Sequence, residues 1–493
     1  MPVKQSPSRK ARGSKFTSAK KVGSTWSSIW LLALVPVLLA IGAARETLNG
    51  INLKLSVNNF NLVRKPAQYH GHGVSGPFFE GWYYKTVLPE AEGSVVFIPG
   101  VFMPKPSPEG TVLNDTLQQP HAFVMVLRDP HTVECLYYAY PLSELEATNG
   151  VGESPEARTT YSIRIGKSTF HEKGMELDLD ASRLVWPSDE DTNEFLAKAL
   201  RERQILHPEL RFDKAGLTQE WERKALSVRG SVKFVDSVRF PTSTLNPTVM
   251  GPFSYLPALE CYHGVVSLYH KTIGSVRFET AAGAKEHEFD VTGGEGYLEK
   301  DHGINFPKSW IWLQTGSFVK ETGSSLLLTI ADVPLLSDKG ILSKIVSSIP
   351  VYGPKLVSKF RLSAFIITLH HARTNTTHNF SVYTGSRVQS VNIDAHTNTG
   401  SGAPNQEVKV VVYGRPGSDA ELIVTAKRPL QVGVPLPGPM FGERNMMGLI
   451  VEETITVDVD VLLRVNGEVV FEDTGRIGGL EVVGDMQGLI GTI

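Results

Sequence analysis

The residues best suited to chemistry in this 493-residue chain gather in one stretch, Gly296–Trp312, with the sequence GYLEKDHGINFPKSWIW. Five ionisable or hydrogen-bonding side chains occupy six successive positions there: Tyr297, Glu299, Lys300, Asp301 and His302. If the stretch is an extended strand, Tyr297, Glu299 and Asp301 share one face, because strand side chains alternate. A phenol and two carboxylates beside apolar aromatic surface can form a proton-donating site. The alternative that the pattern leaves open is a solvated strand end with a salt bridge.

A second cluster of aromatic and acidic residues lies at Gly76–Lys85, GPFFEGWYYK. In an extended strand Glu80 shares a face with Trp82 and Tyr84. A glutamate buried among aromatic rings has a raised pKa, because desolvation disfavours its charged form, and a general acid at neutral pH needs such a pKa. The alternative is a surface glutamate beside a ladder of packing aromatic side chains.

The sequence lacks the familiar signatures of several enzyme classes. It contains no phosphate-binding glycine loop, no GxSxG nucleophile elbow, no HExxH and no Cys/His cluster. His263, His270 and His302 show no spacing typical of metal ligands, so only the fold can bring them together. We therefore predict no metal and no cofactor.

Composition points to a globular, mildly acidic protein. Hydrophobic residues make up 41% of the chain and charged residues 20%, enough apolar side chains for a sizeable core. The net charge is −2, but the first 45 residues hold eight of the 49 basic residues and none of the 51 acidic ones. The acidic remainder argues against nucleic-acid binding, which needs a basic surface. Cys135 and Cys261 lie in apolar strand-like runs and are expected to be buried thiols, although one disulfide between them is possible.

Short runs of β-branched and aromatic residues predict many strands, separated by Gly, Pro, Asn or Asp. Examples before residue 245 are Ser94–Phe102, Ala122–Leu127, Cys135–Tyr140, Tyr161–Ile165, Met175–Leu179 and Gly230–Phe240. Later examples are Glu260–His270, Gly274–Glu279, Glu288–Val291, Ser325–Val333, Leu362–His370, Asn379–Val388, Val408–Tyr413, Glu421–Ala426, Ile455–Val465 and Glu468–Phe471. Asn466 and Gly467 predict a two-residue hairpin. Ser188–Leu206 predicts a helix, because a Ser/Asp cap and an acidic first turn precede good helix formers.

These elements predict a mainly β protein built from two β-barrels or sandwiches. The proline-rich segment Pro241–Pro257 divides residues 51–245, with the helix as an insertion, from residues 246–493. Residues 1–50 contain a basic, disordered start and the apolar run Ile29–Ala44. That run fits a signal anchor, a cleaved signal peptide or an organelle transit sequence, and we favour a membrane-inserted segment. Leu336–Phe360, apolar with four lysines, is either an amphipathic membrane-surface element or a loop and helix over a barrel mouth.

Three blocks of the chain resemble the tocopherol cyclase family and occur in the family's order: GPFFEGWYYK, ECYHGVVSLYH and GYLEKDHGINFPKSWIWLQ. The tail GRIGGLEVVGD (Gly475–Asp485) is also similar, so the resemblance spans most of residues 70–485. The first and third blocks are specific, because they are long and unusual. Residues 1–50, 188–228 and 389–405 lie outside it. The resemblance implies two tandem lipocalin-like β-barrels, related to carotenoid hydratases and some natural-product cyclases.

The resemblance also implies an activity: closing a prenylated hydroquinone to a chromanol without a redox cofactor. An acid protonates the alkene, and the neighbouring phenol oxygen attacks the carbocation. Asp301 is the first candidate for proton donor, with Glu299 and Glu80 as alternatives. His263 and Tyr297 are candidates for handling the phenol proton. The aromatic residues suited to lining the substrate tunnel or stabilising the cation, or simply to packing in a β-core, are Trp82, Tyr84, Trp310 and Trp312.

The chain departs from the family pattern at His302, where the family usually has Trp. His302 is either an added proton shuttle or a sign of a different substrate. At the position of Asp301 the family also allows Asn, which is a reason to keep the other carboxylates as candidates.

We therefore expect a membrane-associated cyclase, in a plastid or the endomembrane system, anchored through Ile29–Ala44 beside its lipid substrate. Two other functions are open on the same fold: a non-catalytic carrier of apolar lipids, and a terpenoid hydratase or isomerase in which water replaces the phenol. The quinol's methylation, its tail saturation and the oligomeric state do not follow from the sequence.

Overall fold

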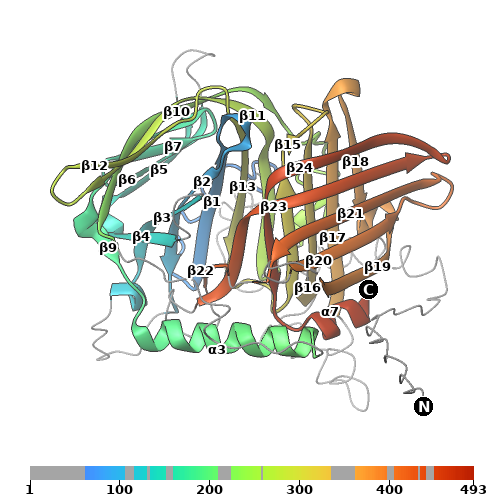
Figure 1. Cartoon of the computed structure of the whole chain (residues 1–493). Helices are drawn as coiled ribbons and strands as arrows, with labels where there is room; N and C mark the ends of the chain where they lie inside the picture. Colours follow the sequence, from blue (N-terminus) through green and yellow to red (C-terminus); the bar gives the residue numbers. More distant parts are fainter. Residues whose placement is uncertain are drawn as a thin grey trace, which may run out of the picture.

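The computed structural model describes residues 62–105, 116–129, 134–151, 159–208, 224–256, 259–334, 361–396, 405–430, 433–439 and 449–493. These residues form two large antiparallel sheets that stand side by side, with the helix α3 (Asp189–Leu206) running along one end of them (Figure 1). The predicted mainly β class is confirmed.

The first sheet has 13 strands and curls into a half-barrel (Figure 1). Its strands in spatial order are β5 (Leu145–Val151), β6 (Thr159–Ile165), β7 (Ser168–His171), β8 (Gly174–Leu179), β10 (Leu226–Val238), β11 (Cys261–Thr280), β13 (Glu295–Gly303), β1 (Phe78–Val87), β2 (Ser94–Met103), β3 (His121–Asp129), β4 (Glu134–Pro141) and β9 (Leu184–Val185). The remaining strand, β12 (Lys285–Asp290), pairs with β11.

The second sheet has 11 strands. Its spatial order is β18 (Thr376–Ser381), β17 (Arg361–His371), β16 (Ser325–Pro334), β14 (Trp310–Thr315), β24 (Glu468–Val483), β23 (Leu449–Val465), β21 (Ala420–Pro429), β20 (Asn405–Tyr413) and β19 (Arg387–His396). Two short strands complete it: β15 (Ser317–Phe318) pairs with β24, and β22 (Val434–Pro437) pairs with β23. The helix α7 (Met486–Thr492) ends the chain.

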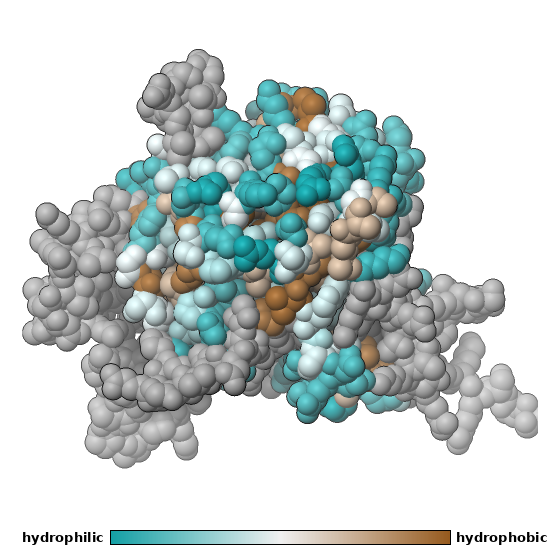
Figure 2. All heavy atoms as spheres, turned by 90° about the vertical axis from the view of Figure 1, so that its left-hand side faces the viewer, coloured by the Kyte–Doolittle hydropathy of each residue, from teal (hydrophilic) through white to brown (hydrophobic). Residues whose placement is uncertain are grey.

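Hydrophobic side chains pack in three cores. One lies inside the half-barrel, around side chains such as Trp82, Tyr84 and Leu298. A second contains Tyr83 and Tyr297 from the first sheet together with Trp312 from the second, so it lies between the sheets. A third belongs to the second sheet and includes side chains of α7. On the half-barrel side the described surface is mainly hydrophilic, with small hydrophobic groups between (Figure 2). The second core therefore joins the two sheets.

The predicted helix is confirmed as α3. Ser188 caps it with a capping box: its hydroxyl accepts the Asp191 backbone N–H, and the Asp191 carboxylate accepts the Ser188 N–H. Arg203, on the last turn, is buried and donates to Glu452 Oε2 of β23 at 2.8 Å and to the Leu430 carbonyl at 2.8 Å. The helix therefore docks on the second sheet through a buried ion pair.

Most predicted strands are confirmed, but their grouping differs from the expectation. Cys261–Thr280 is one long strand that merges two predicted ones, and it pairs with β10 and β13 in the first sheet. The strands between 261 and 303 therefore belong with β1, because their backbone hydrogen bonds go to the first sheet, not to the second β-unit that we expected them to begin. The chain passes from one sheet to the other after Gly303. The predicted domain limits at residue 245 stay predictions.

Smaller outcomes follow. The predicted strand Asn379–Val388 is interrupted by a 3-10 turn at Val382–Thr384, capped by the Ser381 hydroxyl. Asn466 and Gly467 form the predicted hairpin turn, both with positive φ (53° and 80°). Cys135 and Cys261 form no disulfide with each other, and both residues are only partly buried. The predictions for residues 1–50, which include Ile29–Ala44, and for Leu336–Phe360 lie outside the described residues. Within the described residues, no helix has the length and apolar character needed to span a bilayer.

Candidate active site between the sheets

The predicted alternation along β13 is confirmed, and it sorts the candidate residues onto two faces. Glu299 is the register partner of Tyr83 on β1, and Asp301 is the partner of Gly81. Tyr83 and Tyr297 belong to the core between the sheets. Glu299 and Asp301 therefore open toward the second sheet.

Four of the other predicted site residues lie on the opposite face. Glu80 is the register partner of His302, and Trp82 and Tyr84 belong to the core inside the half-barrel. The structure therefore does not bring Glu80, Trp82, Tyr84 and His302 together with Glu299 and Asp301, although all of them lie on the two adjacent strands β1 and β13.

A cavity of about 190 Å³ lies between the sheets. Its polar lining comes from His263, Glu299, Asp301, Glu453 and Glu481. Its apolar lining includes Phe79, Tyr83, Ile98, Phe123, Met125, Phe306, Trp310, Trp312, Ile366, Leu436 and Val451. Both predicted tryptophans of β14 thus face the cavity, and Tyr297 lies behind it. The arrangement is an apolar chamber with a few convergent ionisable groups, which is the usual character of a small-molecule site.

Glu299 accepts two hydrogen bonds on one oxygen. Its Oε2 receives the Tyr297 hydroxyl at 2.5 Å and the Trp312 indole N–H at 3.2 Å. Burial raises the pKa of Glu299 to about 7, against the opposing effect of His263. The carboxyl can therefore hold or release a proton near neutral pH.

His263, on β11, lies between the two predicted carboxylates. Its Nδ1 is 2.8 Å from Asp301 Oδ1, and its Nε2 faces Glu299 Oε2 at 3.6 Å. Burial alone would lower the pKa of His263, but Glu299 and Asp301 raise it to about 9. The imidazole is therefore a cation at neutral pH. The Asp301 side chain is 29% exposed, against 7% for Glu299, so the site opens to solvent on the Asp301 side.

Two further carboxyl groups, Glu453 and Glu481, line the cavity and were not among the predicted residues. They are direct register partners on β23 and β24. Burial raises the pKa of Glu453 to about 7 and that of Glu481 well above its usual value. Glu481 lies in the tail block Gly475–Asp485, which was a signal for it. Glu453 stands next to Glu452 before an alternating run, and nothing in that pattern marks it as part of a site.

Glu80 belongs to a separate buried cluster inside the half-barrel. Lys300, fully buried, forms an ion pair with Glu80 and also donates to the Gln68 carbonyl, and His70 Nδ1 lies 3.1 Å from Glu80 Oε1. Burial would raise the pKa of Glu80, but Lys300 and His70 lower it below its usual value. Glu80 is therefore an ionised partner of Lys300 and not a proton donor.

Two groups of side chains have the composition of a metal site. Donor atoms of His263, Glu299 and Asp301 lie within 4.8 Å of one another, and so do those of His70, Glu80 and His302. In the second group the Lys300 ammonium already neutralises Glu80. In the first group His263 Nδ1 hydrogen-bonds with Asp301, and Glu299 Oε2 accepts from Tyr297 and Trp312. His270, the other histidine considered, packs against Phe234, and burial lowers its pKa to about 3.

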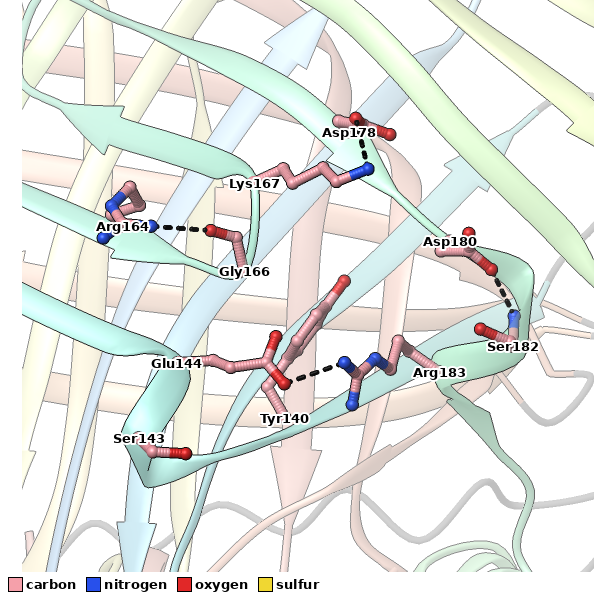
Figure 3. Close-up of a pocket in the computed structure, with 10 residues that line it drawn as sticks. All are labelled: Tyr140, Ser143, Glu144, Arg164, Gly166, Lys167, Asp178, Asp180, Ser182 and Arg183. Carbon is pink, nitrogen blue, oxygen red and sulfur yellow. Dashed lines mark hydrogen bonds and ion pairs between the residues drawn. The ribbon is translucent and has the colours of Figure 1, made fainter.

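A different hollow, of about 420 Å³, lies on the first sheet among charged side chains (Figure 3). Arg183 donates to Glu144 at 2.8 Å, Lys167 lies 3.8 Å from Asp178, and Asp180 accepts the Ser182 backbone N–H (Figure 3). Acidic and basic groups neutralise each other here, and the side chains of these two ion pairs are about one third exposed or more. This hollow lacks the apolar walls of the cavity between the sheets.

Comparison with known proteins gives a fold likeness only. No protein-family model matches the chain, and no curated protein matches it. Among solved structures, an AttH-like protein of Nitrosomonas europaea is similar, with a TM-score of 0.39 and 9% identity over 84% of this chain and 94% of that one. CghA is similar with a TM-score of 0.40 and 10% identity over 83% of this chain and 88% of its own. CghA with Sch210972 gives 0.39 and 9% over the same shares. At these TM-scores the likeness carries no argument about activity.

Proposed function

We propose that the cavity between the sheets is the active site of a cyclase that closes a prenylated hydroquinone to a chromanol by acid–base chemistry, as in tocopherol cyclases. The observation that carries the proposal is the set of buried carboxyl groups with raised pKa values that face an apolar, tryptophan-lined chamber. The sequence blocks at Gly76–Lys85 and Gly296–Trp312 support it. In this proposal each sheet wraps its own core as one lipocalin-like barrel, and the site lies where the barrels meet.

The reaction needs three things that the cavity can supply. A protonated carboxyl donates its proton to the trisubstituted alkene, and the tertiary carbocation forms beside Trp310 and Trp312, whose ring faces stabilise cations. The phenol oxygen then bonds to the cationic carbon, and its proton passes to the Glu299 carboxylate. The His263 imidazolium holds a negative counter-charge from Asp301 and can hydrogen-bond the hydroquinone oxygen. No redox cofactor is needed, because the reaction is an isomerisation.

The size of the cavity bears on how the substrate lies. At about 190 Å³ it is smaller than the 300–1,000 Å³ typical of ligand pockets, roughly enough for the aromatic head and the nearest part of the tail. The rest of a long prenyl chain has to leave the cavity. We further propose that Ile29–Ala44 holds the enzyme at a membrane of a plastid or the endomembrane system, so that the tail stays in lipid.

The direct test is to incubate the purified full-length protein in detergent with phytyl or geranylgeranyl benzoquinol and to analyse the products for chromanol. Chromanol from wild type, but not from a Glu299→Gln/Asp301→Asn variant, is the expected result. Protein that binds the quinol and forms no chromanol overturns the cyclase assignment.

A lipid carrier is the second candidate, because the same apolar chamber would hold a prenylquinone without reacting with it. A carrier keeps its ligand affinity in the Glu299→Gln/Asp301→Asn variant and shows no turnover in either protein. A terpenoid hydratase or isomerase is the third candidate, and its product would carry a new hydroxyl or a shifted double bond in place of the chromanol ring.

A further inference from the structure

We propose that Glu453 and Glu481 form a carboxyl pair that holds and donates the proton for alkene protonation, in place of Asp301, Glu299 or Glu80. The inference rests on the proposed function, whose proton donor it identifies. It assigns a role to two residues of the second sheet, and so makes the site depend on both sheets.

The pairing of the two strands brings the two carboxyl groups together. Glu453 and Glu481 are opposite each other on antiparallel strands, where Cβ atoms are about 4.5–5.5 Å apart. Both side chains line the cavity, and Glu453 is 0% exposed. Two ionised carboxylates this close in an apolar chamber repel each other strongly, so the pair retains a proton.

A hydrogen bond reaches one oxygen of each carboxyl group. The Tyr83 hydroxyl donates to Glu453 Oε1, and the Trp310 indole N–H donates to Glu481 Oε2 at 2.5 Å. Glu453 Oε2 is buried and has no hydrogen-bond partner among the described residues. A buried polar atom without a partner is costly, and a shared proton or a substrate hydroxyl would satisfy it. A proton on this oxygen is therefore enclosed next to the cavity that Glu453 lines.

The other carboxyl groups have partners that suit them to the opposite role. Asp301 accepts from the His263 imidazole, and Glu80 is neutralised by Lys300 on the other face of the sheet. Glu299 receives two hydrogen bonds on one oxygen, an arrangement that stabilises a carboxylate. The cavity thus has an acid wall on the second sheet and a base wall on β13. Trp310 donates a hydrogen bond to Glu481 of the acid wall, and Trp312 donates one to Glu299 of the base wall.

The proton balance closes without another reactant. The O–H bond of the pair breaks as a C–H bond forms on the alkene, and the charge of the pair changes by −1. The phenol O–H breaks as the new C–O bond forms, and its proton passes to Glu299. Proton exchange with solvent on the Asp301 side resets Glu299. The pair regains one proton from solvent, which balances the proton that Glu299 releases. Lys85, on the same face of β1 as Tyr83, donates to the Ile477 carbonyl of β24 at 2.6 Å, and its charge acts on Glu453.

The test compares Glu453→Gln and Glu481→Gln with Glu295→Gln. Glu295, on β13, is a matched control, because like Glu453 it accepts a tyrosine hydroxyl, from Tyr269, but it does not line the cavity. We expect each pair variant to lower chromanol formation by about 10²-fold or more while quinol binding, measured by tryptophan quenching, is retained. The Glu295→Gln variant is expected to keep wild-type turnover.

Three outcomes are informative. If wild type forms chromanol and the pair variants are equally active, the pair is not the donor and the proposed function stands. If wild type forms none, the proposed function fails, and the donor role fails with it. Infrared spectroscopy of folded, ligand-free protein adds a separate readout: the protonated carboxyl band at neutral pH should become weaker in Glu481→Gln and in Glu453→Gln, with the remaining intensity due to Glu299. Its absence from wild type overturns the pair as a proton store.

Discussion

Glu80 and Glu299 lie on adjacent strands yet open onto opposite faces of the first sheet. Glu80 is paired in register with His302 and forms an ion pair with Lys300 inside the half-barrel, whereas Glu299 is paired with Tyr83 and faces the second sheet. The two sequence blocks with candidate acids, Gly76–Lys85 and Gly296–Trp312, thus place these two carboxyl groups in different cores. One carboxylate stabilises the fold, and the other lines the cavity.

Filling the cavity from Gly81 should block ligand binding without unfolding the protein. Gly81 lines the cavity, and an added Cβ would meet Ile98 Cγ2 at 3.7 Å and the Pro99 carbonyl at 3.9 Å, which are ordinary contacts. Gly81→Leu is expected to weaken quinol binding at least tenfold, or about 1.4 kcal/mol, because the side chain occupies ligand space. Tryptophan quenching measures the affinity, and Gly81→Ala is the control. Wild-type affinity in Gly81→Leu would place the ligand elsewhere.

Removing the carboxylate of Glu80 should destabilise the protein strongly. Both Glu80 and Lys300 are almost fully buried, so Glu80→Gln leaves an ammonium without its partner, at a cost of about 3–5 kcal/mol. The double variant Glu80→Gln/Lys300→Met is expected to recover much of that loss, because no buried charge remains. Urea denaturation measures both. Glu421→Gln, in the partly exposed pair with Arg464, is the control and should have a much smaller effect. Equal losses in Glu80→Gln and the control would contradict the buried-pair assignment.

Glu453 should make stability depend on pH in a definite direction. Its pKa in the folded protein is raised by burial from 4.5 to about 7. Between these values the folded state keeps a proton that the unfolded chain has lost, so this contribution to stability is complete below pH 4.5 and is lost as the pH rises to about 7. In Glu453→Gln the contribution is absent. The stability of the variant relative to wild type should therefore increase from pH 4.5 to pH 7 in urea titrations. A constant difference over that range contradicts the raised pKa.

His302 should be dispensable for turnover. Its ring stacks between His70 at 4.0 Å and Tyr262 at 5.1 Å, and burial lowers its pKa well below the usual value, so it stays neutral. His302→Phe keeps the stacking and is expected to leave chromanol formation unchanged. His263→Gln removes the cation of the cavity and is expected to slow turnover by about 10²-fold. Steady-state rates compare the two, and a large loss in His302→Phe would restore the proton-shuttle hypothesis.

Local patterns predicted the elements well. Alternation along Met175–Leu179, the Ser188 cap and the Asn466–Gly467 turn each depend on neighbours in sequence, and each is found in the structure. The grouping of strands was harder to predict. Cys261–Thr280 follows a proline-rich segment that resembles a linker, but its hydrogen bonds go to β10 and β13 of the first sheet. Strand partners far apart in the chain leave no local signal in composition.

The candidate site was predicted only in part, because some of its residues come together through strand pairing between distant parts of the chain. The face shared by Tyr297, Glu299 and Asp301 follows from strand alternation, and it was confirmed. His263 lies next to this face because β11 pairs with β13, where His263 is the register partner of Asp301. The resemblance to tocopherol cyclases suggested a role for His263 in the site, whereas its position in the sequence did not.

The sequence by itself determined which segments become strands, where the helix begins, and which side chains share a face, because these follow from backbone geometry over a few residues. Only the tertiary structure decided which face is inside which core. That choice separated Glu80 from Glu299, and it brought Glu453 and Glu481 from the second sheet to a cavity whose other wall is β13. The physical reason is burial: a carboxyl group becomes an acid or an ion-pair partner according to the neighbours that desolvate it, and those neighbours come from distant parts of the chain.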